Sequence, residues 1–485
     1  VDYGLLDEQD GLIGNPYHYR DSRTSGMESR VFSLVPSQEI YQITGIQSLY
    51  FNTLYQIFSD VCRDAPALSI AKRLLFMPDL INFWLTGVAV GLIGENELGL
   101  RFVPWLAGVA TVAVFLWSMS NWFGRRVAIF GALFLTLSFW HVGWSQTGRH
   151  FALQTLLVLL ALHFFLSHWI GGKSWSQWAS AGFLFVGLFT HSSTAFFLAS
   201  FLAFLGIGWM AAIAGEAERK PATWFRAAIP FLVAIGAYLP IFFGIGRYLV
   251  ANKTAWNPPW NIVGSLLFYL PPWILFTGLA GAMVLVSRRK LHLAALLLLL
   301  NVVPALLVTV SSAVTIASAA YCLASLPALA ILIGQAGDWL LDRSRSGAER
   351  KVAWALICGF FFAQAFSLAH YYLIYNGLKP RWKDVTEFVD QRREPSEEFF
   401  AAEGDVPQFY LGRGESRWVG QSDLYEEPAT GAWYAVYMDG GVLTDQHSRA
   451  FRTLLKTGNL VEVFPLSYGA KDRSLAVFHL PARSD

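Results

Sequence analysis

The chain has 485 residues, of which 54% are hydrophobic and only 14% are charged, and its formal net charge is +2. Soluble proteins carry nearer a quarter of charged residues, and a net charge so close to zero creates no field that would attract nucleic acid. The composition therefore excludes an ordinary soluble protein and a nucleic-acid-binding protein, and it indicates a protein embedded in a lipid bilayer.

The first 99 residues contain no apolar run long enough to cross a membrane. A transmembrane helix needs about 20 consecutive apolar residues, and the apolar run at 80–94 is shorter than that. We therefore expect this run to form a helix that lies along the membrane surface. Because the sequence begins at Val1 rather than Met, we also expect a preceding span or a cleaved signal segment outside the printed sequence.

Ten apolar segments follow, and each is compatible with a helix that crosses the membrane. They cover 100–122, 127–145, 151–170, 176–192, 194–214, 227–249, 261–286, 291–311, 314–336 and 352–373. The sequence therefore predicts a polytopic α-helical membrane protein with about 10 to 12 spans.

The connections between these segments alternate in charge. Lys and Arg concentrate in cytoplasmic connections of membrane proteins, so the basic connections are predicted to be cytoplasmic. Residues 1–99 and 374–485 then lie outside the cytoplasm, and we expect the membrane to be a bacterial inner (plasma) membrane. The basic residues of every second connection are Arg125, Arg126, Lys173, Arg219, Lys220, Arg226, Arg288, Arg289, Lys290, Arg343, Arg345, Arg350 and Lys351.

Residues from about 374 onward are polar and charged, which predicts a small extracytoplasmic α/β domain. Alternating apolar residues predict strands, and a period near 3.6 predicts helices. The expected helices are Asp384–Arg393 and Ser448–Lys456, and the expected strands are Trp433–Met438, Leu460–Phe464 and Leu475–Leu480. The chain thus divides into a first extracytoplasmic loop with juxtamembrane helices (1–99), a transmembrane helical domain (100–373) and this domain (374–485).

The cysteines and histidines do not suggest a metal site or a disulfide framework. Cys322 and Cys358 lie in apolar runs and Cys62 lies in a polar segment, so their spacing fits neither arrangement. No metal ligands are therefore predicted, and the sequence does not indicate whether a divalent metal takes part.

Several short motifs occur in an order that resembles a known family. They are Asn15–Ser22, Ser48–Phe51, Glu97–Pro104, Asn121–Arg126, Ser145–Leu153 and Leu188–His191. Together they resemble the family-39-type GT-C membrane glycosyltransferases, which are relatives of the protein O-mannosyltransferases and of the lipid A aminoarabinose transferases. The resemblance covers about residues 12–373, and it implies a GT-C-like fold.

The resemblance also implies an activity and two site residues. Such enzymes transfer a sugar from a polyprenyl-phosphate donor to an acceptor on the outer face of the membrane. Asp21 falls where the family has an acid in its first outer loop, and a carboxylate there can take a proton from the acceptor hydroxyl. Arg149 falls in the second outer loop, where a fixed cation would stabilise the leaving lipid phosphate.

Each assignment has a simpler alternative. Asp21 also fits a solvated loop acid or a helix cap, and Arg149 fits an interfacial side chain that reaches toward water. Asp7, Glu8 and Glu28 compete with Asp21 as candidate acids. His191 could be a base but more often such a residue is structural, and Lys253 could meet a lipid phosphate or only a lipid headgroup.

Two functions remain after these observations. The first is an integral membrane glycosyltransferase that uses a polyprenyl-phosphate-linked sugar, with membrane lipids and an unnamed acceptor as partners. The second is a catalytically inactive GT-C-fold protein that serves as a structural or lipid-binding subunit of a membrane complex. Departures from the family motifs favour the second, because Ser22 and Thr147 stand where the resemblance implies acids.

Overall fold

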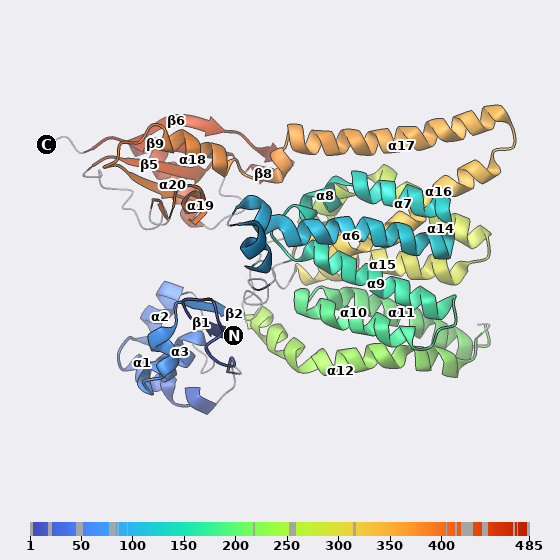
Figure 1. Ribbon diagram of the computed structural model, residues 1–485, viewed down its shortest axis with the longest axis horizontal. Helices are drawn as coiled ribbons and strands as arrows, with labels where there is room; N and C mark the ends of the chain where they lie inside the picture. Colours follow the sequence, from blue (N-terminus) through green and yellow to red (C-terminus); the bar gives the residue numbers. More distant parts are fainter. Residues whose placement is uncertain are drawn as a thin grey trace.

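The computed structural model describes most of the chain as three bodies: a small N-terminal unit (residues 3–76), a bundle of long helices, and a C-terminal α/β domain. The N-terminal unit and the C-terminal domain lie beyond the same end of the bundle (Figure 1). The residues outside the described part are 1–2, 18–21, 45–51, 77–83, 85–86, 95, 217–218, 252–258, 314–316, 404, 413–414, 419–429, 439–444, 469–470, 473 and 483–485.

The N-terminal unit has its own sheet and its own core. Strand β1 (Tyr3–Leu6) pairs antiparallel with β2 (Arg73–Phe76), which closes the unit from its first strand to its last. Val31, Ile40 and Tyr55 form its apolar core. The remaining elements are η1 (Ser22–Thr24), α1 (Met27–Phe32), α2 (Ser37–Thr44), α3 (Thr53–Cys62) and α4 (Pro66–Ile70).

A buried ion pair ties the elements of this unit together. The Arg23 guanidinium lies 2.9 Å from Asp60 Oδ1, and it also donates to the side-chain oxygen of Gln56 at 3.2 Å. The Tyr3 hydroxyl donates to the second Asp60 oxygen at 3.0 Å. Removing one partner of such a pair leaves an uncompensated charge in the interior, so loss of the Asp60 carboxylate would destabilise this unit.

Each of the ten segments predicted to cross the membrane is helical over most of its described residues. The ninth, predicted at 314–336, is helical from Ala319 to Arg343, and its residues 314–316 lie outside the described part. Seven helices are long and apolar enough to span a membrane, and two bent pairs raise that number to nine in the described part of the chain. Helix α10 has 15 residues and is shorter than a full span. The bundle helices are α6 (Glu97–Phe123), α7 (Arg125–Leu137), α8 (Phe139–Ser145), α9 (Phe151–Trp169), α10 (Ser176–Thr190), α11 (Thr194–Ile213), α12 (Pro221–Ala251), α13 (Pro259–Tyr269), α14 (Pro272–Ser287), α15 (Leu291–Ser311), η2 (Ala319–Ser325), α16 (Leu326–Arg343) and α17 (Gly347–Leu373). The shorter apolar run at 80–94 is helical over 87–93.

Two segments that were expected to be continuous spans are broken instead. The chain bends by 62° between α7 and α8 and by 78° between α13 and α14. Ser138 caps the start of α8, and Pro271 with Pro272 ends one helix and begins the next, because proline cannot continue the hydrogen-bond ladder. The length of an apolar run does not indicate a bend inside it, so neither bend is predicted by the sequence.

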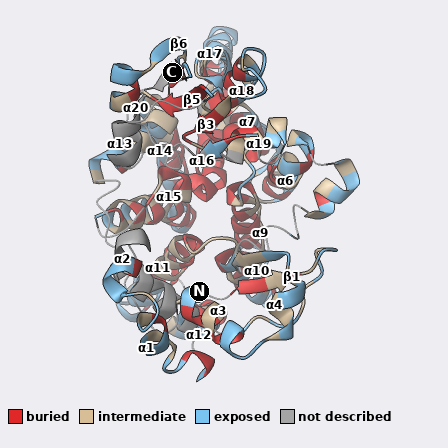
Figure 2. Ribbon diagram, turned by 90° about the vertical axis from the view of Figure 1, so that its left-hand side faces the viewer, coloured by how far each residue is buried: buried red, intermediate tan, exposed pale blue. Residues whose placement is uncertain are grey.

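Helix α16 forms the centre of the bundle. Its span is 94% buried (Figure 2), and it touches neighbours on two sides through glycines. A Cβ atom at Gly281 of α14 would overlap the Leu332 carbonyl oxygen, and one at Gly334 would overlap the Val127 carbonyl oxygen of α7. Small residues allow membrane helices to approach this closely and gain packing energy.

The end of the bundle that carries the basic connections, here called the basic end, is joined by ion pairs. Arg126 at the start of α7 lies 3.1 Å from Asp342 of α16. Arg288, after α14, lies 3.3 Å from Asp338 and 3.0 Å from Asp342. These ion pairs connect α7, α14 and α16, which are also the helices that approach closely at Gly281 and Gly334.

The residues after α17 form a domain of helices and strands. A five-stranded sheet has the order β4-β3-β5-β9-β6, with β5 antiparallel to β9 and parallel to β3. Alternate residues of β5 face two separate cores, one beside α18 and one beside α20. The elements are η3 (Asn376–Leu378), α18 (Trp382–Asp390), β3 (Glu398–Ala401), α19 (Asp405–Leu411), β4 (Arg417–Trp418), β5 (Ala432–Tyr437), α20 (Asp445–Thr457), β6 (Asn459–Phe464), β7 (Ser467–Tyr468), β8 (Lys471–Asp472) and β9 (Leu475–Leu480).

The central position of α16 leads to a stability prediction. Gly281→Ala should lower the melting temperature of the detergent-purified protein, because overpacking at a tight contact costs about 1–3 kcal/mol. Gly206→Ala on α11 is the matched control, since a Cβ there meets nothing within 4 Å and alanine is the better helix former. Equal melting temperatures for the two variants would contradict the central role of this crossing.

Candidate functional site

The connection between α8 and α9 is held at the end of the bundle opposite the basic end. The Tyr372 hydroxyl, near the end of α17, donates to the Gln146 side-chain oxygen at 2.7 Å. The Lys379 ammonium donates to the Gln146 backbone oxygen at 3.2 Å. Gln146 accepts both hydrogen bonds and lies three residues before Arg149. Its fixed position therefore restricts where the Arg149 side chain can reach.

The C-terminal domain contributes to the same region. Tyr410 of α19 donates to the Glu97 carboxylate at the start of α6 at 3.0 Å, and Glu97 also lies 3.0 Å from Arg101. Burial, together with the nearby charge of Arg101 and against the opposing charge of Glu97, lowers the pKa of Lys379 to about 8. The domain is thus fastened to the bundle by charged groups next to the α8–α9 connection.

Two histidines and a tyrosine stack beside this connection. The His150 and His191 rings are parallel, with centroids 4.8 Å apart, and the His191 and Tyr321 ring centroids are 4.5 Å apart. Arg149 is exposed, and its charge acts on the adjacent His150 ring. We call Arg149, His150, His191 and Tyr321 the histidine cluster; they come from three parts of the chain.

Hydrogen bonds fix the orientation of His191. Its Nδ1 accepts from the Ser193 backbone N–H at 3.1 Å, so the proton of the neutral ring resides on Nε2. Gln154 of α9 donates to the Ser193 hydroxyl at 2.9 Å, which holds this turn against the helix. With Nδ1 occupied, His191 presents an N–H donor, and this geometry fits hydrogen bonding to an anion better than proton abstraction.

Both histidines are neutral near pH 7. Burial and, to a smaller extent, the positive charge of Arg149 lower the pKa of His150 to about 4. Burial lowers the pKa of His191 to about 3, with a smaller contribution from His150. His150 Nε2 is buried without a hydrogen-bond partner among the described residues, which is costly for a polar atom and leaves it available to a ligand.

The structure brings together only some of the residues that the sequence suggested. Arg149 and His191 belong to the histidine cluster, whereas Asp21 and Lys253 lie outside the described residues. The competing acids lie in the N-terminal unit. Asp7 accepts from the backbone N–H groups of Gln9 and Gly11 and so stabilises a turn; Glu8 is exposed, and Glu28 lies in the first turn of α1.

Three residues at this site were not expected from the sequence. None of the sequence-based predictions gives His150, Tyr321 or Lys379 a role. Their positions depend on contacts between distant segments, which no local pattern reports. Among the residues that the structure describes, no group of three metal-ligating side chains is found.

Comparisons with known proteins agree with this architecture. Residues 78–243 match a family model described as dolichyl-phosphate-mannose-protein mannosyltransferase. ArnT from Cupriavidus metallidurans, solved bound to undecaprenyl phosphate, resembles the chain with a TM-score of 0.50 and 15% identity, over 82% of this chain and 87% of ArnT. The chain therefore has the GT-C fold of membrane glycosyltransferases, as the ordered motifs predicted.

A second group of curated proteins matches a short part of the chain. The rhamnulokinase of Mannheimia succiniciproducens is 43% identical over 88 residues, which make up 18% of this chain and 18% of the kinase. That of Pectobacterium carotovorum is 47% identical over 92 residues, 19% of this chain and 18% of the kinase. The chain thus spans less than a fifth of the length of these kinases.

The neutral histidines predict a pH-dependent stability. Their pKa values are lower in the folded protein than the ordinary 6.5, so the unfolded chain binds more protons than the folded one between about pH 6.5 and pH 4. Their contribution to stability is present above this range and is lost as the pH falls through it. The melting temperature of the wild type should therefore fall more between pH 7 and pH 4.5 than that of the His150→Asn/His191→Asn double variant. Parallel curves would contradict the burial of these two rings.

Proposed function

We propose that residues from about 78 onward form an integral membrane glycosyltransferase, which moves a sugar from a polyprenyl-phosphate donor to an acceptor outside the cytoplasm. The observation that carries the proposal is the histidine cluster at one end of a GT-C bundle. It combines an exposed guanidinium with two neutral imidazoles. The related fold of ArnT was solved with undecaprenyl phosphate bound.

The orientation of the bundle supports an extracytoplasmic site. The basic end carries Arg126 and Arg288 together with the other basic connections, and such residues favour the cytoplasm. The histidine cluster lies at the opposite end. The C-terminal domain contacts the bundle at that end through Tyr410 and Glu97, so it would also be extracytoplasmic.

The cluster has the groups that a phosphate leaving group requires. During transfer the bond between the sugar's anomeric carbon and a phosphate oxygen breaks, and the acceptor's nucleophilic atom forms the new bond. Negative charge then grows on the lipid phosphate. The Arg149 guanidinium can pair with two phosphate oxygens, and His191 Nε2–H can donate a further hydrogen bond. These fixed donors stabilise the developing charge.

Arg149 provides the direct test. Arg149→Ala should lower transfer from a radiolabelled undecaprenyl-phosphate-linked sugar by about 100-fold, the effect typical of losing one donor to a developing charge. Arg149→Lys should recover only part of the rate, because lysine cannot bind two oxygens in the same plane. The measurement is the initial rate in proteoliposomes.

The matched control is Lys173→Ala, which removes an exposed cation from the connection at the basic end. It should retain the rate of the wild type. A rate for Arg149→Ala equal to that of Lys173→Ala would remove Arg149 from the mechanism.

We infer that the N-terminal unit is a module of separate origin and not the first outer loop of the transferase. The extents of the matches support this division. The kinases match 18–19% of the chain and ArnT matches 82%, while the mannosyltransferase match begins at residue 78. The hydrogen-bonded Arg23–Asp60 pair and the β1–β2 sheet close residues 3–76 as a unit. The unit is then related to a segment of a sugar kinase.

This division predicts that two acids of the N-terminal unit can be replaced without loss of sugar transfer. Asp60→Asn should open the N-terminal unit to limited proteolysis, because it removes the negative charge that compensates the buried Arg23, while sugar transfer stays at the wild-type rate. Asp21→Asn should also leave transfer unchanged. Loss of transfer in Asp21→Asn would contradict the separate module and restore Asp21 as the catalytic base that the motif order suggests.

A second function is favoured by the chemistry of the histidine cluster. None of its four members is an acid, and Thr147 stands where the family resemblance implies a carboxylate. A GT-C protein of this kind could bind a lipid phosphate without turnover and serve as a subunit of a membrane complex. Binding of undecaprenyl phosphate that depends on Arg149, with no transfer from any lipid-linked sugar, would select this function.

A further inference from the structure

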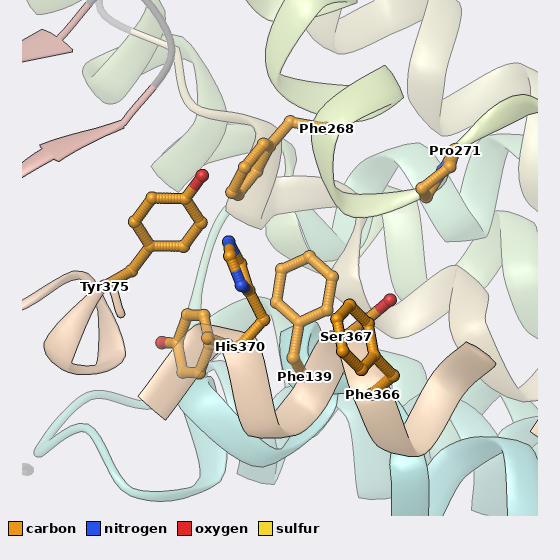
Figure 3. A pocket seen from close by; sticks show the side chains of 8 residues that line it. Phe139, Phe268, Pro271, Phe366, Ser367, His370 and Tyr375 are labelled. Atoms are coloured by element: carbon orange, nitrogen blue, oxygen red, sulfur yellow. The ribbon is translucent and has the colours of Figure 1, made fainter. Parts of the chain in front are cut away.

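A cavity of about 240 Å³ lies where α8, the α13–α14 break and the end of α17 meet. Figure 3 shows its lining, which is largely aromatic. None of the residues that line it belongs to the histidine cluster. The cavity is lined by Phe139, Phe268, Phe366, Ser367, His370 and Tyr375, among others.

The lining changes from apolar to polar along the axis of α17. Phe366 lies one helical turn before His370, and Tyr375 follows the end of the helix. The Phe139 and Phe268 ring centroids are 5.6 Å apart, and those of His370 and Tyr375 are 4.8 Å apart. A molecule in the cavity would therefore meet phenylalanines and, toward the C-terminal end of α17, an imidazole and a phenol; this end of the cavity is called the rim.

The cavity is reached from the lipid side of the bundle. The span of α17 is only 17% buried, and Phe366 is 63% exposed, so in a membrane this face touches hydrocarbon. The neighbouring break at Pro271 interrupts a helix near the same level. Irregular backbone at membrane depth is tolerated where it is buried or lines a cavity. The helix break at Pro271 lines this cavity, and a molecule bound there would cover it.

We propose that this cavity binds one phospholipid of the leaflet at this end of the bundle. Part of an acyl chain lies among Phe139, Phe268 and Phe366. His370 and Tyr375 donate hydrogen bonds to the phosphate or ester oxygens. The volume is below the 300–1,000 Å³ typical of sites that enclose a whole small molecule, and it suits a segment of one chain whose remainder stays in the bilayer.

Filling the cavity tests the proposal. The protein is reconstituted in vesicles of deuterated phosphatidylglycerol, extracted into detergent and analysed by native mass spectrometry. Ser367→Phe, which places a ring in the cavity, should retain about one labelled lipid fewer than the wild type. Ala369→Phe is the matched control, because it adds the same ring to an exposed position of α17 that does not line the cavity, and it should retain as many labelled lipids as the wild type.

A second variant distinguishes loss of lipid binding from misfolding. His370→Ala removes a polar group from the rim without adding volume, and it should also lower retention at an unchanged melting temperature. Equal retention in the wild type and in the folded cavity variants would overturn the proposal. The last experiment is a competition with the donor lipid. Added undecaprenyl phosphate should not displace the retained phospholipid. Displacement would assign the cavity to the donor lipid and would also overturn the proposal.

Discussion

The architecture depends on how closely the helices around α16 approach one another. In a bilayer an apolar helix interacts about equally well with lipid hydrocarbon and with another apolar helix. Helix association there therefore depends on close packing and on polar contacts. Here Gly281 and Gly334 remove the side chains that would separate α14 and α7 from α16. The ion pairs of Arg126 and Arg288 then fix the same three helices at the basic end. The two bends, between α7 and α8 and between α13 and α14, lie away from this closely packed basic end.

The histidine cluster follows from that arrangement. Helix α8 bends away from α7, and the α8–α9 connection that follows lies beside His191 and beside Tyr321 of η2. Tyr372 and Lys379 hold Gln146 of this connection, so the site is built from the bundle and from the linker to the C-terminal domain together. The buried imidazoles are neutral and present donors, while the exposed arginine supplies the charge. Such a combination attracts a phosphate without placing several positive charges next to one another.

The sequence predicted most elements but few of the contacts between them. The strand Leu475–Leu480 has the expected ends, and helix α17 begins only five residues before the predicted span. Hydrophobic length and alternation are local properties, so they can be read without a structure. The bends at Ser138 and Pro271 lie inside apolar runs and leave the average hydrophobicity unchanged. The stacking of His150 on His191 joins two separate connections. The motif order indicated Asp21 and Arg149 as members of one site, and His191 only as a candidate base beside a structural alternative.

The N-terminal unit has its own sheet and a buried Arg23–Asp60 pair, so it is a folded body in its own right. The motif order predicts a first outer loop with Asp21 here, and that assignment stays a prediction. The central claim concerns the helical bundle, namely that a lipid phosphate binds at the histidine cluster. A structure determined with undecaprenyl phosphate bound tests it most directly. We predict phosphate oxygens within hydrogen-bond distance of the Arg149 guanidinium and of the His150 and His191 rings. Phosphate density at the basic end or against the N-terminal unit, with the histidine cluster empty, would contradict the account.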